Sequence, residues 1–525
     1  MGIPICKIHK FATCGETLAK VISQVCSKRF LLMHFVKKIR PIIGLPAMFI
    51  SFMALFLLMK PTNVQSKQAN ETGGTANTTT YLPMVQNRFD ASLGLPIFGV
   101  QMYGPTSNTS KYYDALQGSN ATWVRVEISW ASAEPTLTAP PSYQWDAIDA
   151  GLAAARPDFG GYNIVATVNR APAWAATYDT GPINPNNLEN FAEFMGALVE
   201  RYDGDGIDDA PGSPVVLYWE MYNEPDSNSI VDATFSPPVG WGNHGEQYAF
   251  MLEEIYPVVK AANPQAQVVF GGIAYDFLKS DGGKFVESFL TDVLDAGGDL
   301  YFDVMNFHSY PAFYTRWTDN QGPGLLEKAN VIRSVLASYG LDKPIIITEA
   351  GWHDNNASGP SIPGSPQIQS RYVVQLFTQS MAADLDLMIW WMLYDVGGGY
   401  PYNTGLVTND DPPVEKLAYQ VYQTAVAELS TAHFVKTLPT SQTGNSLMEV
   451  HQFNDNVHNR TLYVAWLNRV DTTATASLRL PVSSATVKNS ITGNVIVRSD
   501  GNDGVMDGFT TFTVGANPLF IEVEK

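Results

Sequence analysis

Two glutamates in this 525-residue sequence follow directly on hydrophobic runs. Glu224 belongs to the segment WEMYNEPD (219–226), and Glu349 belongs to the segment ITEAGW (347–352). Two carboxylates that face each other suit the cleavage of a glycosidic bond, because one protonates the leaving oxygen while the other attacks the sugar or activates water. Their proximity also separates their pKa values, since one negative carboxylate disfavours ionisation of the other. A lone glutamate of this kind is more often a solvated or capping residue, so the pair carries the prediction.

The segments that must hold these glutamates alternate apolar runs with amphipathic stretches. Eight apolar runs predict strands at 98–102, 123–128, 164–168, 215–222, 268–273, 304–307, 345–348 and 388–393. The runs are nearly continuous in apolar residues, as in parallel strands that helices cover on their outer face. Apolar residues at three- and four-residue spacing predict helices at 188–202, 248–255, 284–296, 325–339, 367–383 and 414–429.

Strands that alternate with helices favour a (β/α)₈ barrel, in which catalytic side chains lie at the carboxyl ends of the strands. An open doubly wound sheet is the alternative, but its G-x-G-x-x-G motif between the first strand and helix is absent. After residue 431 short alternating runs predict an antiparallel β-sandwich, at 448–453, 461–467, 474–480, 495–499, 509–514 and 518–524. The predicted fold class is therefore α/β, a TIM barrel followed by a small β-sandwich domain.

The N-terminal segment differs in composition from the rest of the chain. It holds all three cysteines, nine Lys and Arg residues, and a single acidic residue, Glu16. Residues 42–59 carry no charge and have basic flanks, which is typical of a signal peptide or a membrane anchor and disfavours a buried core helix. We expect translation to start at Met33. The predicted domains are an export signal or membrane anchor (1–60), a flexible linker (61–94), the barrel (95–430) and the sandwich (431–525).

Residues 61–525 are strongly acidic. They hold 23 of the 32 basic and 50 of the 51 acidic residues, which gives a net charge of −27, and they contain no cysteine. This charge disfavours nucleic acid and polyanionic glycans such as pectate, whereas it suits a protein that meets neutral glycans. A domain without cysteine also needs no disulfide to fold outside the cell. We expect a monomer, secreted or anchored on the extracellular side of a membrane, whose partner is a neutral β-linked glycan and not a nucleic acid.

The motifs together resemble those of the clan A glycoside hydrolases, a retaining (β/α)₈ group with Asn-Glu ending strand four and Glu ending strand seven. The resemblance covers about 95–430, and it points to β-xylosidase-like family 39 or to family 5-like cellulases. The C-terminal sandwich is similar to the C-terminal module of the β-xylosidase-like members. The resemblance implies that Glu224 is the general acid/base, that Glu349 is the nucleophile and that Asn223 binds the 2-hydroxyl of the substrate.

Further residues match the pattern of the clan, namely Arg125 in TWVR (122–125), His308 and Tyr310 in NFHSY (306–310), and Trp391 in WWMLYD (390–395). A guanidinium at Arg125 can donate a hydrogen bond to the nucleophile, although an ion pair inside the barrel would use the same geometry. Tyr310 can donate to Glu349 as well, whereas His308 has a structural alternative. Trp391 can stack on the apolar face of a sugar, or it can be part of the core.

Other residues near the strand ends are weaker candidates for sugar binding. Asn169 ends the third strand run and is predicted to reach a sugar hydroxyl, although members of the clan often have His there. Trp352 and His353 follow the nucleophile and either line the site or brace their loop. Aromatic residues in the loops after strands four, six and eight are stacking surfaces for further sugar units or pack the loops: Trp241, Phe313, Tyr314, Trp317, Tyr400 and Tyr402.

We predict no cofactor and no catalytic metal, because no H-E-x-x-H, C-x-x-C or P-loop pattern stands in a suitable context. An acidic loop, DGDGIDD (203–209), offers Asp203 and Asp205 as ligands for a structural Ca²⁺. Ile207 stands where an EF-hand would need its third ligand, which favours a solvated turn.

These observations predict a retaining glycoside hydrolase that cleaves β-glycosidic bonds of polysaccharides or oligosaccharides by double displacement. A transglycosylase would use the same intermediate with a sugar as the acceptor. A carbohydrate-binding surface protein without turnover is the non-enzyme alternative, but binding alone does not need two carboxylates. The loops, and not the strand motifs, determine which sugar and which linkage are recognised.

Overall fold

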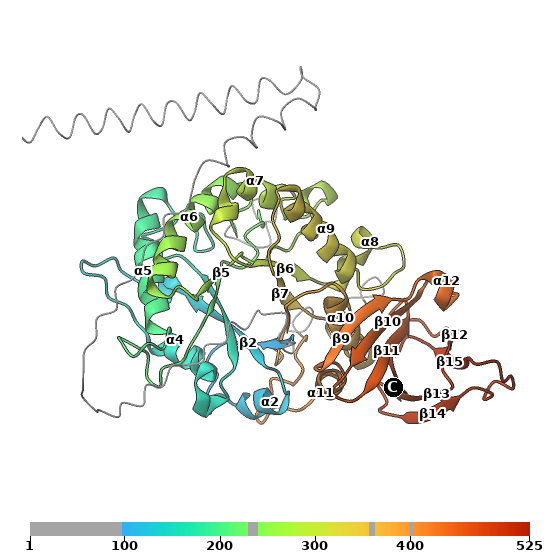
Figure 1. The fold of residues 1–525 in the computed structure, drawn as a ribbon. Coiled ribbons are helices and arrows are strands. Elements are labelled where there is room, and N and C mark those ends of the chain that lie inside the picture. The colour runs from blue at the N-terminus through green and yellow to red at the C-terminus, as the bar shows by residue number, and fades with distance from the viewer. Residues whose placement is uncertain (1–96, 229–239, 356–362, 398–402) are drawn as a thin grey trace, which may run out of the picture. The chain divides into compact units, whose positions relative to one another are not determined.

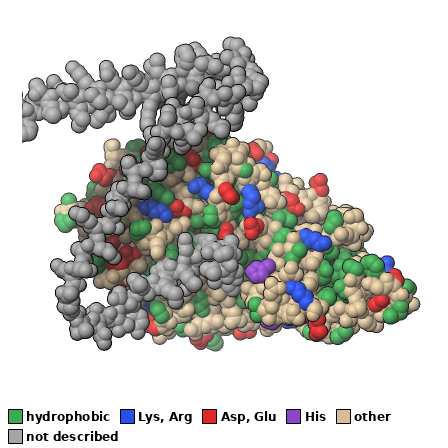
Figure 2. All heavy atoms as spheres, in the orientation of Figure 1, with side chains coloured by type: hydrophobic (Ala, Val, Ile, Leu, Met, Phe, Trp, Pro, Cys, Tyr) green, Lys and Arg blue, Asp and Glu red, His purple; other side chains and the backbone are tan. Residues whose placement is uncertain are grey.

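The computed structural model describes residues 97–228, 240–355, 363–397 and 403–525. The predicted export segment, the linker, Tyr400 and Tyr402 lie outside these ranges. Within the described ranges, no helix is both long and apolar enough to cross a membrane. On the face shown in Figure 2, acidic and basic side chains are interspersed with apolar ones.

Eight parallel strands form the first sheet, in the order β5-β4-β3-β2-β1-β8-β7-β6. Isolated bridges from Val269 to Val304 and from Ile273 to Phe307 join β5 to β6, and so connect the two edges of the sheet. The predicted (β/α)₈ barrel is therefore confirmed (Figure 1). The strands are β1 (Phe98–Gln101), β2 (Trp123–Ser129), β3 (Asn163–Asn169), β4 (Tyr218–Met221), β5 (Gln267–Val269), β6 (Met305–Ser309), β7 (Ile345–Ala350) and β8 (Leu387–Trp390).

Helices alternate with these strands along the chain. The longer ones are α5 (Leu188–Arg201), α6 (Gly245–Ala262), α7 (Phe289–Asp295), α9 (Leu325–Ser338), α10 (Pro366–Ala382) and α11 (Leu417–Leu429). Short helices occupy the connections: α2 (Tyr113–Gly118), α3 (Trp130–Ala133), α4 (Asp146–Gly151) and α8 (Tyr314–Trp317). The predicted helix 284–296 is shorter than expected, because Phe285 forms β-bridges with Ser227 and Leu278 and the helix starts only at Phe289.

The C-terminal part contains two antiparallel sheets, which confirms the predicted β-sandwich. The larger has the order β14-β13-β16-β11-β10-β9, and the smaller pairs β12 with β15. The strands are β9 (Ala432–Thr437), β10 (Met448–Asp455), β11 (Arg460–Leu467), β12 (Ala476–Leu480), β13 (Ser484–Asn489), β14 (Val495–Ser499), β15 (Thr510–Val514) and β16 (Leu519–Glu524), with the short helix α12 (Thr440–Thr443) between β9 and β10. Strands β9 and β13 were not predicted, because β9 is largely exposed and β13 has only Ala485 and Val487 as apolar residues.

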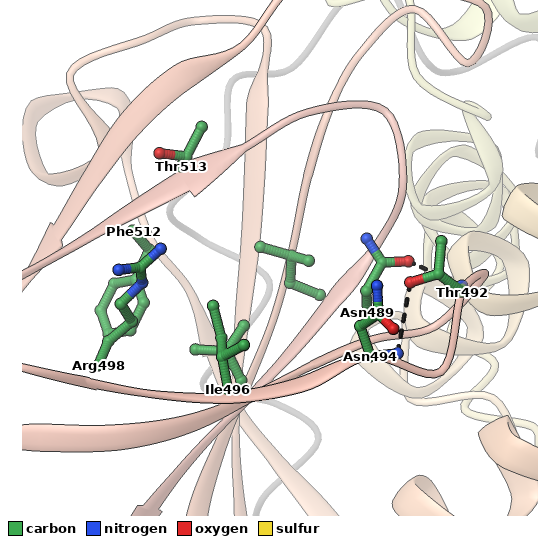
Figure 3. A pocket seen from close by; sticks show the side chains of 9 residues that line it. Asn489, Thr492, Asn494, Ile496, Arg498, Phe512 and Thr513 are labelled. Carbon is green, nitrogen blue, oxygen red and sulfur yellow. Dashed lines mark hydrogen bonds between the residues drawn. The ribbon is translucent and has the colours of Figure 1, made fainter.

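A hollow of about 320 Å³ lies between the β13–β14 hairpin and the strands β15 and β16 (Figure 3). Val487, Phe512 and Leu519 give it apolar walls, whereas Asn489 and Arg498 are polar residues of its lining. The smaller sheet has only two strands, so part of the inner face of the larger sheet stays open here.

The barrel and the sandwich share an apolar core that includes Phe98 and Phe377 of the barrel and Trp466 and Phe520 of the sandwich. Polar contacts accompany it. Gln379 of α10 donates to a carboxylate oxygen of Glu449 at 2.7 Å, and both side chains are buried. The sandwich therefore packs directly against the last helices of the barrel.

Phe377 joins three elements of the barrel, since its ring lies 4.3 Å from that of Phe98 and 5.5 Å from that of Tyr422. Phe377→Ala would leave a cavity between β1, α10 and α11, and we expect it to lower the free energy of unfolding by about 3–5 kcal/mol. Urea denaturation followed by tryptophan fluorescence measures this loss. Phe250→Ala is the control, because Phe250 is 44% exposed on α6 and its truncation should change stability by less than about 0.5 kcal/mol. Equal effects of the two substitutions would contradict the packing described here.

Asp455, at the end of β10, is a buried carboxylate with several donors. It accepts hydrogen bonds from the side chains of Arg460 at 2.9 Å, His458 at 2.7 Å and Thr431 at 3.1 Å. Burial alone would raise the pKa of Asp455, but these hydrogen bonds outweigh burial and lower it from 3.8 to about 2. The fold therefore favours the ionised form of this carboxyl group.

Because the pKa of Asp455 is lower in the folded than in the unfolded chain, its contribution to stability is present above about pH 4 and is lost as the pH falls towards 2. We expect Asp455→Asn to lower the free energy of unfolding by about 2 kcal/mol at pH 7 and by clearly less at pH 3. Denaturant unfolding of both proteins at the two pH values measures the difference. A loss that is the same at pH 7 and at pH 3 would contradict the assignment.

Candidate active site

Arg125 of β2 is completely buried inside the barrel, and all five of its N–H groups have acceptors. Nε and Nη2 donate to the two oxygens of Glu220 at 2.8 and 3.0 Å. Nη1 donates to Gln101 at 2.8 Å and to Glu349 at 2.7 Å, and Nη2 also donates to Asn223 at 2.7 Å. Arg125 thus forms an ion pair with Glu220 inside the barrel and also donates to Glu349, the predicted nucleophile. Both roles that the sequence allowed for this arginine are therefore present.

Glu220 of β4 is the buried counter-charge of Arg125. It also accepts hydrogen bonds from Thr167 of β3 at 2.6 Å, Asn306 of β6 at 2.9 Å and Thr348 of β7 at 3.0 Å. Burial alone would raise the pKa of Glu220, but the charge and hydrogen bonds of Arg125 outweigh it and lower the pKa. The barrel interior is therefore held by an ionised and fully hydrogen-bonded pair.

Glu349 of β7 receives two hydrogen bonds, from Arg125 and from the hydroxyl of Tyr310 at 2.9 Å. Its side chain is 9% exposed. Burial and the nearby carboxylates Glu349 and Glu224 raise the pKa of Tyr310 well above its usual value, so this tyrosine keeps its proton and acts as a donor. Two donors stabilise the negative charge of Glu349 and fix its orientation.

Glu224 lies just past β4, in a backbone conformation with a φ of +45° that residues other than glycine rarely adopt. Its N–H donates to the carbonyl of Gly272 at 3.1 Å, which holds this loop against the segment after β5. Its side chain is 22% exposed and hydrogen-bonds Nδ1 of His308 at 3.1 Å. Three side-chain atoms, one each from Glu224, His308 and Glu349, lie within 4.8 Å of one another. The structure therefore brings the two glutamates together at the carboxyl end of the barrel.

His308 of β6 links the two carboxylates. Its Nδ1 is 3.1 Å from Glu224 and 3.6 Å from Glu349, and its Nε2 is 3.2 Å from the hydroxyl of Thr348. Burial alone would lower the pKa of His308, but the two carboxylates raise it. Burial would raise the pKa of Glu224, but its hydrogen bond with His308 and nearby positive charges lower it. Each of the two groups therefore favours the charged form of the other.

The remaining predicted residues surround this centre. Trp391 follows β8; its indole N–H donates to the hydroxyl of Tyr103 at 3.3 Å, and its ring meets that of Tyr310 edge-on at 6.5 Å. The side-chain oxygen of Asn223 accepts a hydrogen bond from Arg125, and this bond directs the side chain of Asn223 towards the glutamates. Asn169 is nearly buried and donates to Glu127 at 3.2 Å. Seven of the eight predicted residues thus lie at or near the carboxyl ends of the strands, whereas Arg125 lies deeper in β2 and reaches Glu349 and Asn223 with its side chain.

Several weaker candidates have structural contacts instead. Trp352 donates to the carbonyl of Pro363 and packs on Tyr372, so it braces its loop, and His353 is 3% exposed beside it. Trp241 is fully buried. Among the other loop aromatics, Phe313 stacks with Phe277, and Trp317 stacks with Tyr275 and donates to Asp276.

Sequence reasoning missed Gln101, Tyr103, Glu127 and Glu220 as members of this site. A usable signal existed for two of them: Glu127 stands two residues beyond Arg125, on the same face of β2, and Glu220 is an acid within an apolar strand. Tyr103 has no such signal, because only the fold brings it to Trp391.

Among the residues that the structure describes, two clusters of side chains have the composition of a metal site. One consists of Glu224, His308 and Glu349, and the other of Asp203, Asp205 and Asp209. In the second cluster, carboxylate oxygens of Asp203 and Asp205 accept hydrogen bonds from backbone N–H groups of their own loop. The calcium site at Asp203 and Asp205 stays a prediction.

Comparisons with known proteins agree with this geometry. The model of the family described as Cellulase (glycosyl hydrolase family 5) matches residues 85–396. No curated protein sequence matches the chain. A similar solved structure is a family 39 glycoside hydrolase from Bacteroides cellulosilyticus WH2, with a TM-score of 0.60 and 18% identity over 82% of this chain and 81% of that chain.

Two further structures share the fold. A monomeric beta-xylosidase from Caulobacter crescentus CB15 has a TM-score of 0.50 and 12% identity, over 82% of this chain and 97% of that one. A family 51 alpha-L-arabinofuranosidase from Bifidobacterium longum has a TM-score of 0.52 and 14% identity, with the same coverage of 82% and 97%. The family model spans more than half of the 525 residues and agrees with the observed barrel, so the chain belongs to glycosyl hydrolase family 5, the cellulase family, and is a clan A glycoside hydrolase.

Proposed function

We propose that the protein is a retaining β-glycosidase that acts on polysaccharides or oligosaccharides. The observation that carries this proposal is the approach of Glu224 and Glu349, whose nearest carboxylate oxygens lie within 4.8 Å. Retaining enzymes hold their carboxyl groups about 5–5.5 Å apart, whereas inverting enzymes need about 6.5–9.5 Å to admit a water molecule. The short separation therefore supports a double displacement.

In the first step, a carboxylate oxygen of Glu349 forms a bond to the anomeric carbon while the bond from that carbon to the leaving oxygen breaks. Glu224 takes part in its protonated form and gives this proton to the leaving oxygen. Arg125 and Tyr310 hold Glu349 in position through the hydrogen bonds described above. In the second step, Glu224 takes a proton from water, the water oxygen bonds to the anomeric carbon, and Glu349 leaves. No cofactor takes part in either step.

The other site residues would bind the sugar. Asn223 has its amide N–H₂ available for the 2-hydroxyl, since its oxygen is held by Arg125. Trp391 presents a partly exposed ring for stacking on a sugar face. The acidity of residues 61–525 supports a neutral glycan as the substrate. The uncharged run 42–59 supports export or anchoring on the extracellular side of a membrane. We propose that the enzyme is a monomer.

A panel of glycans tests the activity. We expect hydrolysis of at least one β-linked polysaccharide or aryl β-glycoside, with products of retained configuration by NMR. Aryl α-L-arabinofuranosides belong in the panel, because one structural neighbour is an alpha-L-arabinofuranosidase; cleavage of these alone would contradict the β-specificity. Products longer than the substrate would indicate transglycosylation, and binding without turnover would indicate a carbohydrate-binding protein.

The roles of the two glutamates can be separated with azide. Glu349→Ala should lower kcat by about 10⁴-fold or more, because no nucleophile remains, and azide should restore turnover with an α-glycosyl azide as product. With Glu224→Ala, azide should instead give the β-glycosyl azide, since the glycosyl-enzyme still forms. Glu254→Ala, on the exposed surface of α6, is the control and should keep wild-type activity. An α-glycosyl azide from the Glu224 variant would reverse the two roles.

A further inference from the structure

A third carboxylate, Glu127, lies at the carboxyl end of β2, and the mechanism above does not use it. It stands two residues beyond Arg125, and alternate residues of a strand point to the same face. Its side chain therefore faces the barrel interior like that of Arg125, but nearer to the end where Glu224 and Glu349 lie. Unlike Arg125, Glu127 is only partly buried.

Two amides hold this carboxylate. Asn169 of β3 donates to one oxygen of Glu127 at 3.2 Å, and Gln101 of β1 donates to the other at 3.5 Å. The neighbouring guanidinium groups have other partners, since Arg125 pairs with two glutamates and Arg170 pairs with Asp179 at 2.8 Å. Each oxygen of a carboxylate accepts two hydrogen bonds, so both oxygens of Glu127 keep an acceptor position.

Tyr103 lies beside the stacking surface of Trp391. Its hydroxyl accepts the indole N–H of Trp391 at 3.3 Å. Burial raises the pKa of Tyr103, and the negative charges of Glu127 and Glu349 raise it further, so the phenol keeps its proton. Gln101, which donates to Glu127, also accepts a hydrogen bond from Arg125, the partner of Glu349, so Glu127 belongs to the same hydrogen-bond network as the proposed nucleophile.

There is also space beside Glu127. It lines a hollow of about 810 Å³ together with Ser129, Tyr143 and Trp145. The rings of Tyr143 and Trp145 lie 5.2 Å apart. The hollow also reaches Ile148 of α4 and Arg201 of α5, and none of the eight predicted site residues lines it, so it provides open space beside Glu127 without being part of the lining around Glu224 and Glu349.

We propose that Glu127 is a specificity-determining residue that accepts hydroxyl protons from a sugar stacked on Trp391, and that it selects neutral sugars over sugars bearing a carboxylate at that edge. This inference rests on the proposed function. A sugar hydroxyl supplies the donor that the two oxygens lack, in a charge-assisted hydrogen bond. A sugar carboxylate would instead meet a like charge in a partly desolvated position, and Arg125 cannot compensate it because its donors are all in use.

The test compares Glu127→Gln with the wild type on paired neutral and anionic probes. The pairs are 4-nitrophenyl β-D-glucoside with the β-D-glucuronide, and hydroxyethylcellulose with carboxymethylcellulose. We expect kcat/KM on the neutral probe to fall about 10- to 100-fold, since one hydrogen bond to a charged group is lost. The ratio of kcat/KM for the anionic to the neutral probe should rise at least tenfold, which a merely structural role of Glu127 would not produce.

Two variants complete the design. Glu127→Asp keeps the charge and should keep the preference for the neutral probe, although it shortens the side chain. Glu254→Gln, on the exposed face of α6, should match the wild type on every probe. Wild-type kinetics of Glu127→Gln, or an equal loss on both probes of a pair, would overturn the inference while leaving the glycosidase proposal intact.

If the wild type cleaves none of these probes, the role of Glu127 can be tested by binding alone. Isothermal titration calorimetry then measures the affinity of cellohexaose and xylohexaose for the Glu349→Ala protein, with and without Glu127→Gln. If Glu127→Gln lowers the affinity for either oligosaccharide at least tenfold, the role of Glu127 is supported, although the proposal of hydrolysis has failed. Unchanged binding, or no binding of either oligosaccharide, would overturn the inference.

Discussion

The buried pair of Arg125 and Glu220 is the interaction on which the rest of the site depends. Removing two charges from water is costly, and the cost is offset only where the pair has good geometry and its remaining donors and acceptors are satisfied. Both conditions hold, because the guanidinium uses all five N–H groups and the carboxylate accepts from further strands. The loss of either partner would leave an uncompensated charge in the middle of the barrel.

The same pair also positions the groups that we propose to react. Through it, Gln101 of β1, Asn223 after β4 and Glu349 of β7 are bonded to a single rigid cation. A guanidinium is planar and its donors diverge at fixed angles, so it sets the directions of these side chains relative to one another. A lysine at this position would carry the same positive charge but would lack the fixed directions of the guanidinium donors. Structural stability and the orientation of Glu349, the proposed nucleophile, therefore have a common physical origin in this barrel.

Local patterns in the sequence were sufficient for the barrel, because buried parallel strands are nearly continuous apolar runs. They also identified Glu224 and Glu349, since acids at strand ends stand out against such runs. Strand β9 is largely exposed and β13 has only two apolar residues, so their partners in the sheet define them. The partners of Glu220 come from β2, β3, β6 and β7, and such long-range choices are not encoded in any local spacing.

The charge balance of the site explains how one carboxyl group can serve first as an acid and then as a base in the proposed cycle. In the free enzyme the negative charges of Glu349 and Glu224 raise the pKa of His308, whose Nδ1 lies 3.1 Å from a carboxylate oxygen of Glu224. When Glu349 becomes an ester of the sugar, its negative charge disappears. A carboxylate at Glu224 then has one like charge fewer beside it, and like charge is what disfavours ionisation. In the proposed cycle, the covalent step itself therefore favours Glu224 as the base that the second step requires.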